Sequence, residues 1–336
     1  MNPDDLRFDA AINPYGCSPA VVNALAEAVA AKGYRHYGDP DAGGLRARLA
    51  ERWSLAPENL LVYNGCGEGL VWQCMSRLLL PGGVFICPFP SYERFVDVGR
   101  RCARRLVEVP LEAPSWRLPL ERFIDEARRS EARLAMISSP NNPTGNLLLD
   151  EAALTALVEA LPGCTVVIDE AYAEYPGVSF APLVRRHRNL VVLKTFSKAY
   201  GLAGLRVGYV AAHETAAAEL RKFQIPWAVD ALALTAAEAA LADQRYLDEI
   251  VARIRGDVAS FGAALRRLPH VLPQPTDANF HLLELRGIDH DRLAPALAAR
   301  GLRVRRRSDM PQHVRVTSMT PEANAVLLDA LAQVRR

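Results

Sequence analysis

The sequence has 336 residues, half of them hydrophobic, and its 40 basic side chains nearly balance 38 acidic ones. That length suits about two domains. A formal net charge of +2 gives no reason to expect nucleic acid or an anionic membrane surface as a partner. We also expect no membrane-spanning helix, because the chain has no run of about 18 uncharged apolar residues.

The six cysteines are scattered along the chain, and no two of them form a CxxC pair. This spacing predicts a reducing, cytoplasmic environment and no metal site. The first residues, MNPDDLRFDA, are acidic and lack the apolar core of a secretory signal, which also favours the cytoplasm.

Residues 9–19, DAAINPYGCSP, contain two prolines and a glycine, which disfavour a helix and predict an ordered arm. A helix is expected over residues 19–32, with a proline in its first turn. Tyr34 and Tyr37 then fall in a turn-rich loop before a predicted helix at 45–53. Surface packing explains these two tyrosines as well as a functional role does.

Two apolar runs, 60–63 and 84–87, predict short strands. The first leads into the turn NGCGEG and a predicted helix at 70–80, an arrangement that points backbone N–H groups at a phosphate. Many turns in α/β proteins are equally rich in glycine, so this signal is weak alone. After the second strand, Tyr92 either stacks on a flat cofactor or packs in the core.

Two further strands are predicted at 134–137 and 165–168, the second β-branched and therefore central in a sheet. Asn142 precedes a proline, which disfavours a helix and leaves its amide to bond outward. Asp169 ends the central strand, where a buried carboxylate is costly without a partner. A protonated ring nitrogen would be such a partner, and capping of the next turn is the alternative.

The stretch TFSKAYGLAGLRVGY follows a predicted strand at 190–193. Ligands of open α/β sheets bind beyond the carboxyl ends of strands, where Lys198 would lie as a nucleophile. Thr195, Ser197 and Arg206 could grip an anion beside it. A solvated lysine is the ordinary alternative, but the chain has only four lysines against 36 arginines. The group suggests an aldehyde that carries a phosphate.

The C-terminal part of the chain changes pattern. Residues 213–268 are predicted to be mainly helical, with an interruption at 224–227, and a break follows at 273–277. Short strands and helices then alternate, which indicates a small α+β domain. The predicted strands are 278–283, 301–304 and 314–317, and the predicted helices are 292–300 and 321–334.

The motifs INPYG, SSPNNPTG, DEAY and TFSKAYGLAGLRVGY occur in this order along nearly the whole chain. Together they resemble the fold-type I, pyridoxal-phosphate-dependent aminotransferases of class I/II, and within them the histidinol-phosphate aminotransferase-like subgroup. The resemblance implies an α/β, aspartate aminotransferase-like fold. Its large α/β/α domain, with a mostly parallel central sheet, would bind pyridoxal 5'-phosphate through residues 33–245. Residues 1–32 and 246–336 would form the smaller α+β domain.

The resemblance also implies roles for single residues. Lys198, Asp169 and Tyr172 would be catalytic, with Lys198 binding the cofactor aldehyde and moving protons at the substrate Cα. Asp169 would pair with the ring nitrogen. The residues implied to bind the cofactor are Tyr37, Cys66, Gly67, Tyr92, Asn142, Asp169, Tyr172, Thr195, Ser197, Lys198 and Arg206.

Four residues are implied to contact the substrate: Tyr15, Asn142, Arg305 and Arg315. Arg315 matches the arginine that holds the substrate α-carboxylate, and Arg305 the one that contacts a distal phosphate. Tyr37 matches a tyrosine that reaches the cofactor phosphate of a second subunit, which predicts a homodimer.

The implied reaction moves an amino group from a donor to 2-oxoglutarate, as in amino-acid biosynthesis. The donor would be an amino acid or an amino-alcohol phosphate, either similar to histidinol phosphate or aromatic. Ile12 and the segment PWAVDALA at 226–233 are instead similar to threonine-phosphate decarboxylases. A cofactor-binding regulator without turnover is a third reading, although such proteins usually carry a DNA-binding domain for which this chain has no room.

Overall fold

The computed structural model describes residues 6–65, 82–103 and 105–334. Its main feature is a seven-stranded sheet in the order β1-β7-β6-β5-β4-β2-β3. The neighbours from β6 to β3 pair in parallel, whereas β7 is antiparallel to both β1 and β6. The strands are β1 Leu60–Asn64, β2 Val84–Phe89, β3 Arg105–Pro110, β4 Ala132–Ser138, β5 Thr165–Asp169, β6 Leu190–Thr195 and β7 Val207–Ala212.

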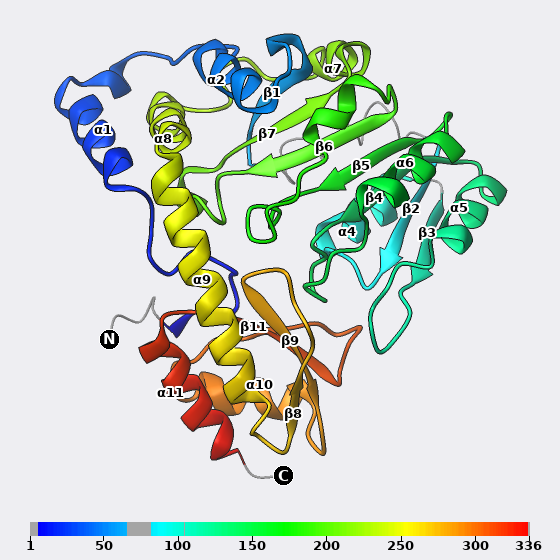
Figure 1. Cartoon of the computed structure of the whole chain (residues 1–336), viewed down its shortest axis with the longest axis vertical. Helices are drawn as coiled ribbons and strands as arrows, with labels where there is room; N and C mark the ends of the chain where they lie inside the picture. Colours follow the sequence, from blue (N-terminus) through cyan, green and yellow to red (C-terminus); the bar gives the residue numbers. More distant parts are fainter. Residues whose placement is uncertain (1–5, 66–81, 104, 335–336) are drawn as a thin grey trace.

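Both faces of this sheet are buried, because successive side chains of a strand point to opposite faces. In β1, Leu60 and Val62 join one apolar cluster while Leu61 and Tyr63 join another. Helices α2, α5, α6 and α8 cover the first face, and α4 and α7 cover the second. The result is the three-layer α/β/α arrangement with a mostly parallel sheet that the sequence predicted (Figure 1).

A second, antiparallel sheet has four strands in the order β10-β11-β9-β8. It packs with α10 and α11 around its own apolar cluster, which confirms the smaller α+β unit. The N-terminal arm joins it, because Phe8 is buried in that cluster and its carbonyl accepts from the Thr317 amide at 2.8 Å. The strands are β8 Val271–Pro273, β9 Phe280–Leu285, β10 Arg305–Arg306 and β11 His313–Thr317.

One long helix, α9, connects the two units. Its first half, with Ile250 and Ile254, packs in the core of the large sheet, and Phe261 and Leu265 pack in the small core. Figure 1 shows it running from α8 down to the small sheet. Helix α1 packs against α8. The division at residues 33–245, with 1–32 and 246–336 in the small domain, stays a prediction.

The helices are α1 Pro19–Ala30, α2 Gly43–Trp53, α4 Glu93–Cys102, α5 Leu120–Arg129, α6 Glu151–Ala160, α7 Glu214–Arg221, α8 Ala231–Ala242, α9 Gln244–Leu265, α10 His290–Ala298 and α11 Pro321–Ala332. Short 3-10 helices are η2 Gly33–Arg35, η3 Pro57–Asn59, η5 Ala181–Arg185 and η6 Ala203–Leu205. No helix in the described part of the chain combines the length and the apolar character that a membrane span requires.

The strand predicted at 301–304 is wrong. Gly301 continues a turn with φ of +77°, and Arg303 forms only a single bridge, to Arg7 of the N-terminal arm. Regular pairing starts at Arg305, which lies opposite Arg315 in β11. The sequence reading also assigned no element to β3, β7, β8, α4, α5 or α6. The helix predicted at 70–80 lies outside the described residues.

Candidate active site

A cavity of about 420 Å³ opens beyond the carboxyl ends of the parallel strands. Segments that follow β2, β4, β5 and β6 line it, together with the N-terminal arm and the edge of the small sheet. The structure therefore brings together most of the residues singled out in the sequence. The predicted site residues in the lining are Tyr92, Asn142, Asp169, Tyr172, Thr195, Ser197, Lys198, Arg206, Arg305 and Arg315.

Lys198 lies in the turn after β6, and its amine reaches the cavity. Its Nζ donates to the backbone carbonyl of Ala10 at 3.1 Å and lies 5.6 Å from the centroid of the Tyr172 ring. The arm at Ala10 thus lies directly beside the amine. Sequence reasoning had given this part of the arm no role.

Asp169 is the last residue of β5, and its side chain is almost fully buried, with 7% of the residue exposed. One carboxylate oxygen accepts from the Ala171 amide at 3.0 Å, and the other accepts from the Ser138 hydroxyl at 3.4 Å. Burial raises the pKa of this carboxyl to about 6, although these bonds and the charge of Lys198 oppose the rise. A cationic partner in the cavity would therefore stabilise the carboxylate.

Arg206 and two hydroxyl residues form a candidate anion site. The Arg206 guanidinium donates to the Ser197 hydroxyl at 3.2 Å and to the Ala203 carbonyl at 3.1 Å. The Ser197 amide donates to the Thr195 hydroxyl at 3.1 Å. Gly201 lets the arm pass close to this turn, because a Cβ at its φ of +74° would lie 2.6 Å from the Gly16 carbonyl.

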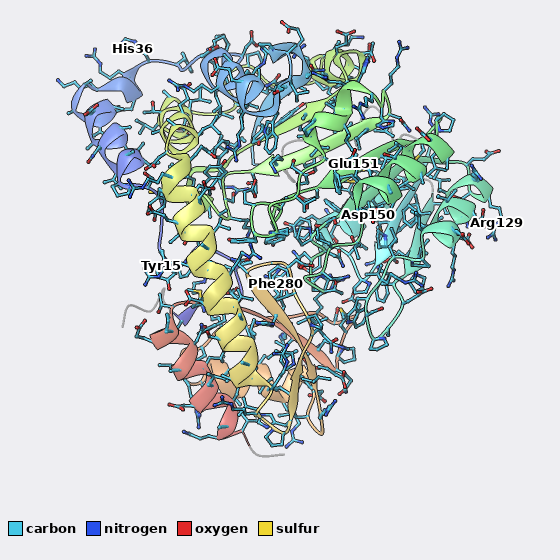
Figure 2. The ribbon with its side chains drawn as sticks, viewed as in Figure 1. Tyr15, His36, Arg129, Asp150, Glu151 and Phe280 are labelled. Atoms are coloured by element: carbon cyan, nitrogen blue, oxygen red, sulfur yellow. The ribbon has the colours of Figure 1, made fainter. Side chains whose placement is uncertain are left out.

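Arg315 projects from β11 into the same cavity and is nearly buried. It donates to the Asn142 side-chain oxygen at 2.8 Å and to the Asp9 carbonyl at 2.6 Å. Its guanidinium carbon lies 4.9 Å from the centroid of the Phe280 ring, at the end of the small sheet that faces the large unit (Figure 2). Burial lowers the pKa of this guanidinium. Its buried Nε has no hydrogen-bond partner among the described residues.

The structure adds charged residues that sequence reasoning missed. Glu93 and Arg307 both line the cavity, and Glu93 forms an ion pair with Arg305. Arg307 is held by Asp309 at 2.6 Å and by the Ser91 carbonyl. The position of Glu93 directly after Tyr92 was the available signal. No sequence pattern indicated that Glu93 would pair with Arg305, which is distant in the chain.

Four predicted site residues are not in the described lining. Tyr15 lies on the arm beside α9 (Figure 2), and its hydroxyl donates to Asp257 at 2.6 Å. Tyr37 is 87% exposed, and its ring centroid lies 5.6 Å from that of Trp227. The other two, Cys66 and Gly67, lie outside the described residues.

The sequence profile described as "Aminotransferase class I and II" matches residues 3–331. The histidinol-phosphate aminotransferase of Roseiflexus castenholzii is 37% identical over 339 residues, which cover 98% of this chain and 89% of that protein.

Two solved structures are also similar to this chain. The histidinol-phosphate aminotransferase of Sinorhizobium meliloti, in complex with pyridoxal-5'-phosphate, has a TM-score of 0.89 and 26% identity over 99% of this chain and 94% of its own. The L-threonine-O-3-phosphate decarboxylase of Porphyromonas gingivalis has a TM-score of 0.84 and 28% identity over 97% and 98%. These likenesses confirm the predicted fold. The chain therefore belongs to the class I and II aminotransferases, the pyridoxal-phosphate-dependent enzymes that its motifs resemble.

Proposed function

We propose that the enzyme transfers the amino group of histidinol phosphate, or of an aromatic or phosphorylated amino acid, to 2-oxoglutarate. The observation that carries this proposal is the shared cavity of Lys198, Asp169 and Arg315, with Arg305 at its edge. The similarity to histidinol-phosphate aminotransferases over nearly the whole chain supports the choice of donor.

The residues of the cavity fit pyridoxal phosphate. The buried Asp169 carboxyl, with its raised pKa, suits a protonated ring nitrogen, and the site at Thr195, Ser197 and Arg206 suits a phosphate. Tyr92 would contact the ring face, and Asn142 and Tyr172 its edge. When bound, the cofactor supplies an electron sink for the electrons left when a bond at the substrate Cα breaks.

The chain's own groups would do the remaining work. The Lys198 amine would hold the cofactor aldehyde and would then remove the proton from the substrate Cα, and it lies within hydrogen-bond reach of the Ala10 carbonyl. Arg315 would bind the α-carboxylate of an amino acid or oxo acid, and Arg305 a distal phosphate. Two anchors fix the rotation of the substrate, which decides whether Cα loses a proton or a carboxylate.

The direct test is to incubate the purified, cofactor-loaded protein with histidinol phosphate and 2-oxoglutarate and to measure glutamate. We expect glutamate in proportion to enzyme. Arg315→Gln should lower kcat/KM by about 10²-fold, because one bidentate charge-assisted contact is lost. Arg129→Gln, an exposed change on α5 far from the cavity, is the control. Absence of glutamate with this donor and with a panel of amino acids would refute the proposal.

A second candidate is decarboxylation of threonine phosphate. Ile12, the residue that resembles those decarboxylases, lines the cavity, and one of them is a structural neighbour. Carbon dioxide released from threonine phosphate without any oxo acid would identify this activity.

We also propose that the enzyme is a homodimer in the cytoplasm. Exposed apolar side chains gather on α1, η2 and the segment before α8, and Tyr37 would reach a neighbouring cavity from there. The exposed residues are Val22, Val29, Tyr34, Tyr37, Ile225 and Trp227. Sedimentation should give twice the chain mass at micromolar concentration. A fully active monomer would exclude this role of Tyr37.

A further inference from the structure

Most of the arginines that line the main cavity pair with carboxylates. The pairs are Arg7–Asp9 at 3.3 Å, Arg94–Asp97 at 3.2 Å, Arg307–Asp309 at 2.6 Å and Arg305–Glu93, and Glu93 also lies 3.9 Å from Arg307. Arg315 differs, since no carboxylate of the described residues lies within ion-pair distance of it. At Arg315 a substrate anion therefore meets a guanidinium whose hydrogen-bond partners are uncharged. The arginines beyond Arg315 are already paired with carboxylates.

Among these carboxylates, Glu93 is the one that pairs with Arg305, the predicted phosphate contact. It is the first residue of α4, and its side chain is 34% exposed. Glu93 and Arg305 line both the main cavity and a second cavity of about 570 Å³. Their ion pair therefore stands at the boundary between the two spaces, where the distal end of a bound donor would lie.

A phosphate that approaches Arg305 meets the Glu93 carboxylate as a competitor of the same charge. The Arg305 and Glu93 side chains are 48% and 34% exposed, so water weakens this repulsion without removing it. A donor with an uncharged distal group can bind at Arg315 and leave the pair at Arg305 intact.

We propose that Glu93 is a specificity-determining residue, because a donor with a distal phosphate must displace its carboxylate from Arg305 whereas an uncharged donor need not. This inference rests on the proposed function, since it assigns the distal contact of the same cavity. Glu93 thus sets the relative KM of phosphorylated and unphosphorylated donors.

The test compares holoenzyme Glu93→Gln with the wild type, using histidinol phosphate and histidinol as donors, because these two molecules differ only in the phosphate. We expect KM for histidinol phosphate to fall about tenfold, with the histidinol KM within about twofold. Glu112→Gln is the matched control, because it removes the same charge from an exposed ion pair with Arg117. An unchanged or higher KM for the phosphorylated donor, or equal changes for both donors, would overturn the proposal.

Binding of inorganic phosphate to the holoenzymes, measured by calorimetry, gives a readout without turnover. Glu93→Gln should bind phosphate about tenfold more tightly, and adding Arg305→Gln should remove that gain. If Glu93→Gln does not fold, Glu93→Ser serves in its place. Tighter phosphate binding without turnover of histidinol phosphate would reject the proposed function but support the role of Glu93. Turnover of histidinol phosphate with unchanged phosphate binding would support the proposed function and reject the role of Glu93.

Discussion

The two lysines of the β6 segment lie four residues apart in surroundings of opposite character. Lys194 is inside the strand, 2% exposed, with its Nζ 3.0 Å from Glu170 and 3.0 Å from Glu174. Lys198 follows the strand and reaches the cavity. Burial opposes the charge of Lys194, but the carboxylates of Glu174 and Glu170 outweigh it and hold the pKa of Lys194 well above its usual value.

The difference shows why the strand end carries the chemistry. An ammonium held between two carboxylates keeps its proton, so the Lys194 amine is not available as a nucleophile. The side chains of residues 190–193 in β6 point into one of two packed cores, and the cavity is reached only from Thr195, at the end of the strand, onward. Lysine content alone does not separate the two residues. Their position relative to the end of the strand does.

The largest effect is expected at Lys198. Lys198→Ala should lower kcat/KM at least about 10⁴-fold, because the group that would hold the cofactor and move the proton is removed. Lys222→Ala, which removes an exposed lysine paired with Glu219 at 2.6 Å, should leave the rate nearly unchanged. Turnover of Lys198→Ala within a factor of ten of wild type would contradict the comparison of the two lysines.

Lys194→Met should act on stability instead. It leaves two buried carboxylates without their common partner, so the free energy of unfolding should fall by about 3–5 kcal/mol. Urea unfolding measures this change, and Lys222→Met should change it by less than about 1 kcal/mol. The folded fraction of Lys194→Met should still turn over substrate. A loss below about 1 kcal/mol would mean that the buried network contributes little.

Asp169→Asn tests the buried carboxyl at the end of the neighbouring strand, β5, through the pH dependence of the free energy of unfolding. The pKa of Asp169 rises from 3.8 to about 6 on folding, because burial disfavours the charged form. Ionised Asp169 therefore destabilises the apoprotein, increasingly as pH rises from about 4 to 6 and fully above that range. The Asn variant should be up to about 3 kcal/mol more stable at pH 8, and this gain should vanish near pH 4. An equal gain at both pH values would contradict the assignment.

The smallest effect is expected at Tyr37, the predicted site residue farthest from the packed interior. If its hydroxyl reaches the cofactor phosphate of a second subunit, Tyr37→Phe should weaken cofactor binding by at most about tenfold, the value of one hydrogen bond. Tyr34→Phe is the control, since Tyr34 is also exposed, at 60%. Equal cofactor affinities in the wild type, Tyr37→Phe and Tyr34→Phe would remove the reason to place Tyr37 at that phosphate.

Sequence patterns predicted five of the seven strands of the large sheet and most of the site residues at its carboxyl edge. Buried parallel strands such as β5 and β6 are continuous apolar runs, and polar residues directly after them meet at one edge. Asp169 and Lys198, which 28 residues separate, were therefore both expected at this edge. Helices α4 and α5 were missed although Phe95 and Val98, and Phe123 and Ala127, are buried at the three- and four-residue spacing of an amphipathic helix.

Only the tertiary structure decided which charges meet. Arg305 and Glu93 come from different units, and Lys198 meets the Ala10 carbonyl of an arm that crosses from the small sheet. The failed strand at 301–304 has the same cause, since Arg303 finds its partner at Arg7. A short-range pattern records whether a side chain will be buried and on which face. It does not record which distant side chain lies opposite, because that depends on how separately folded units pack together.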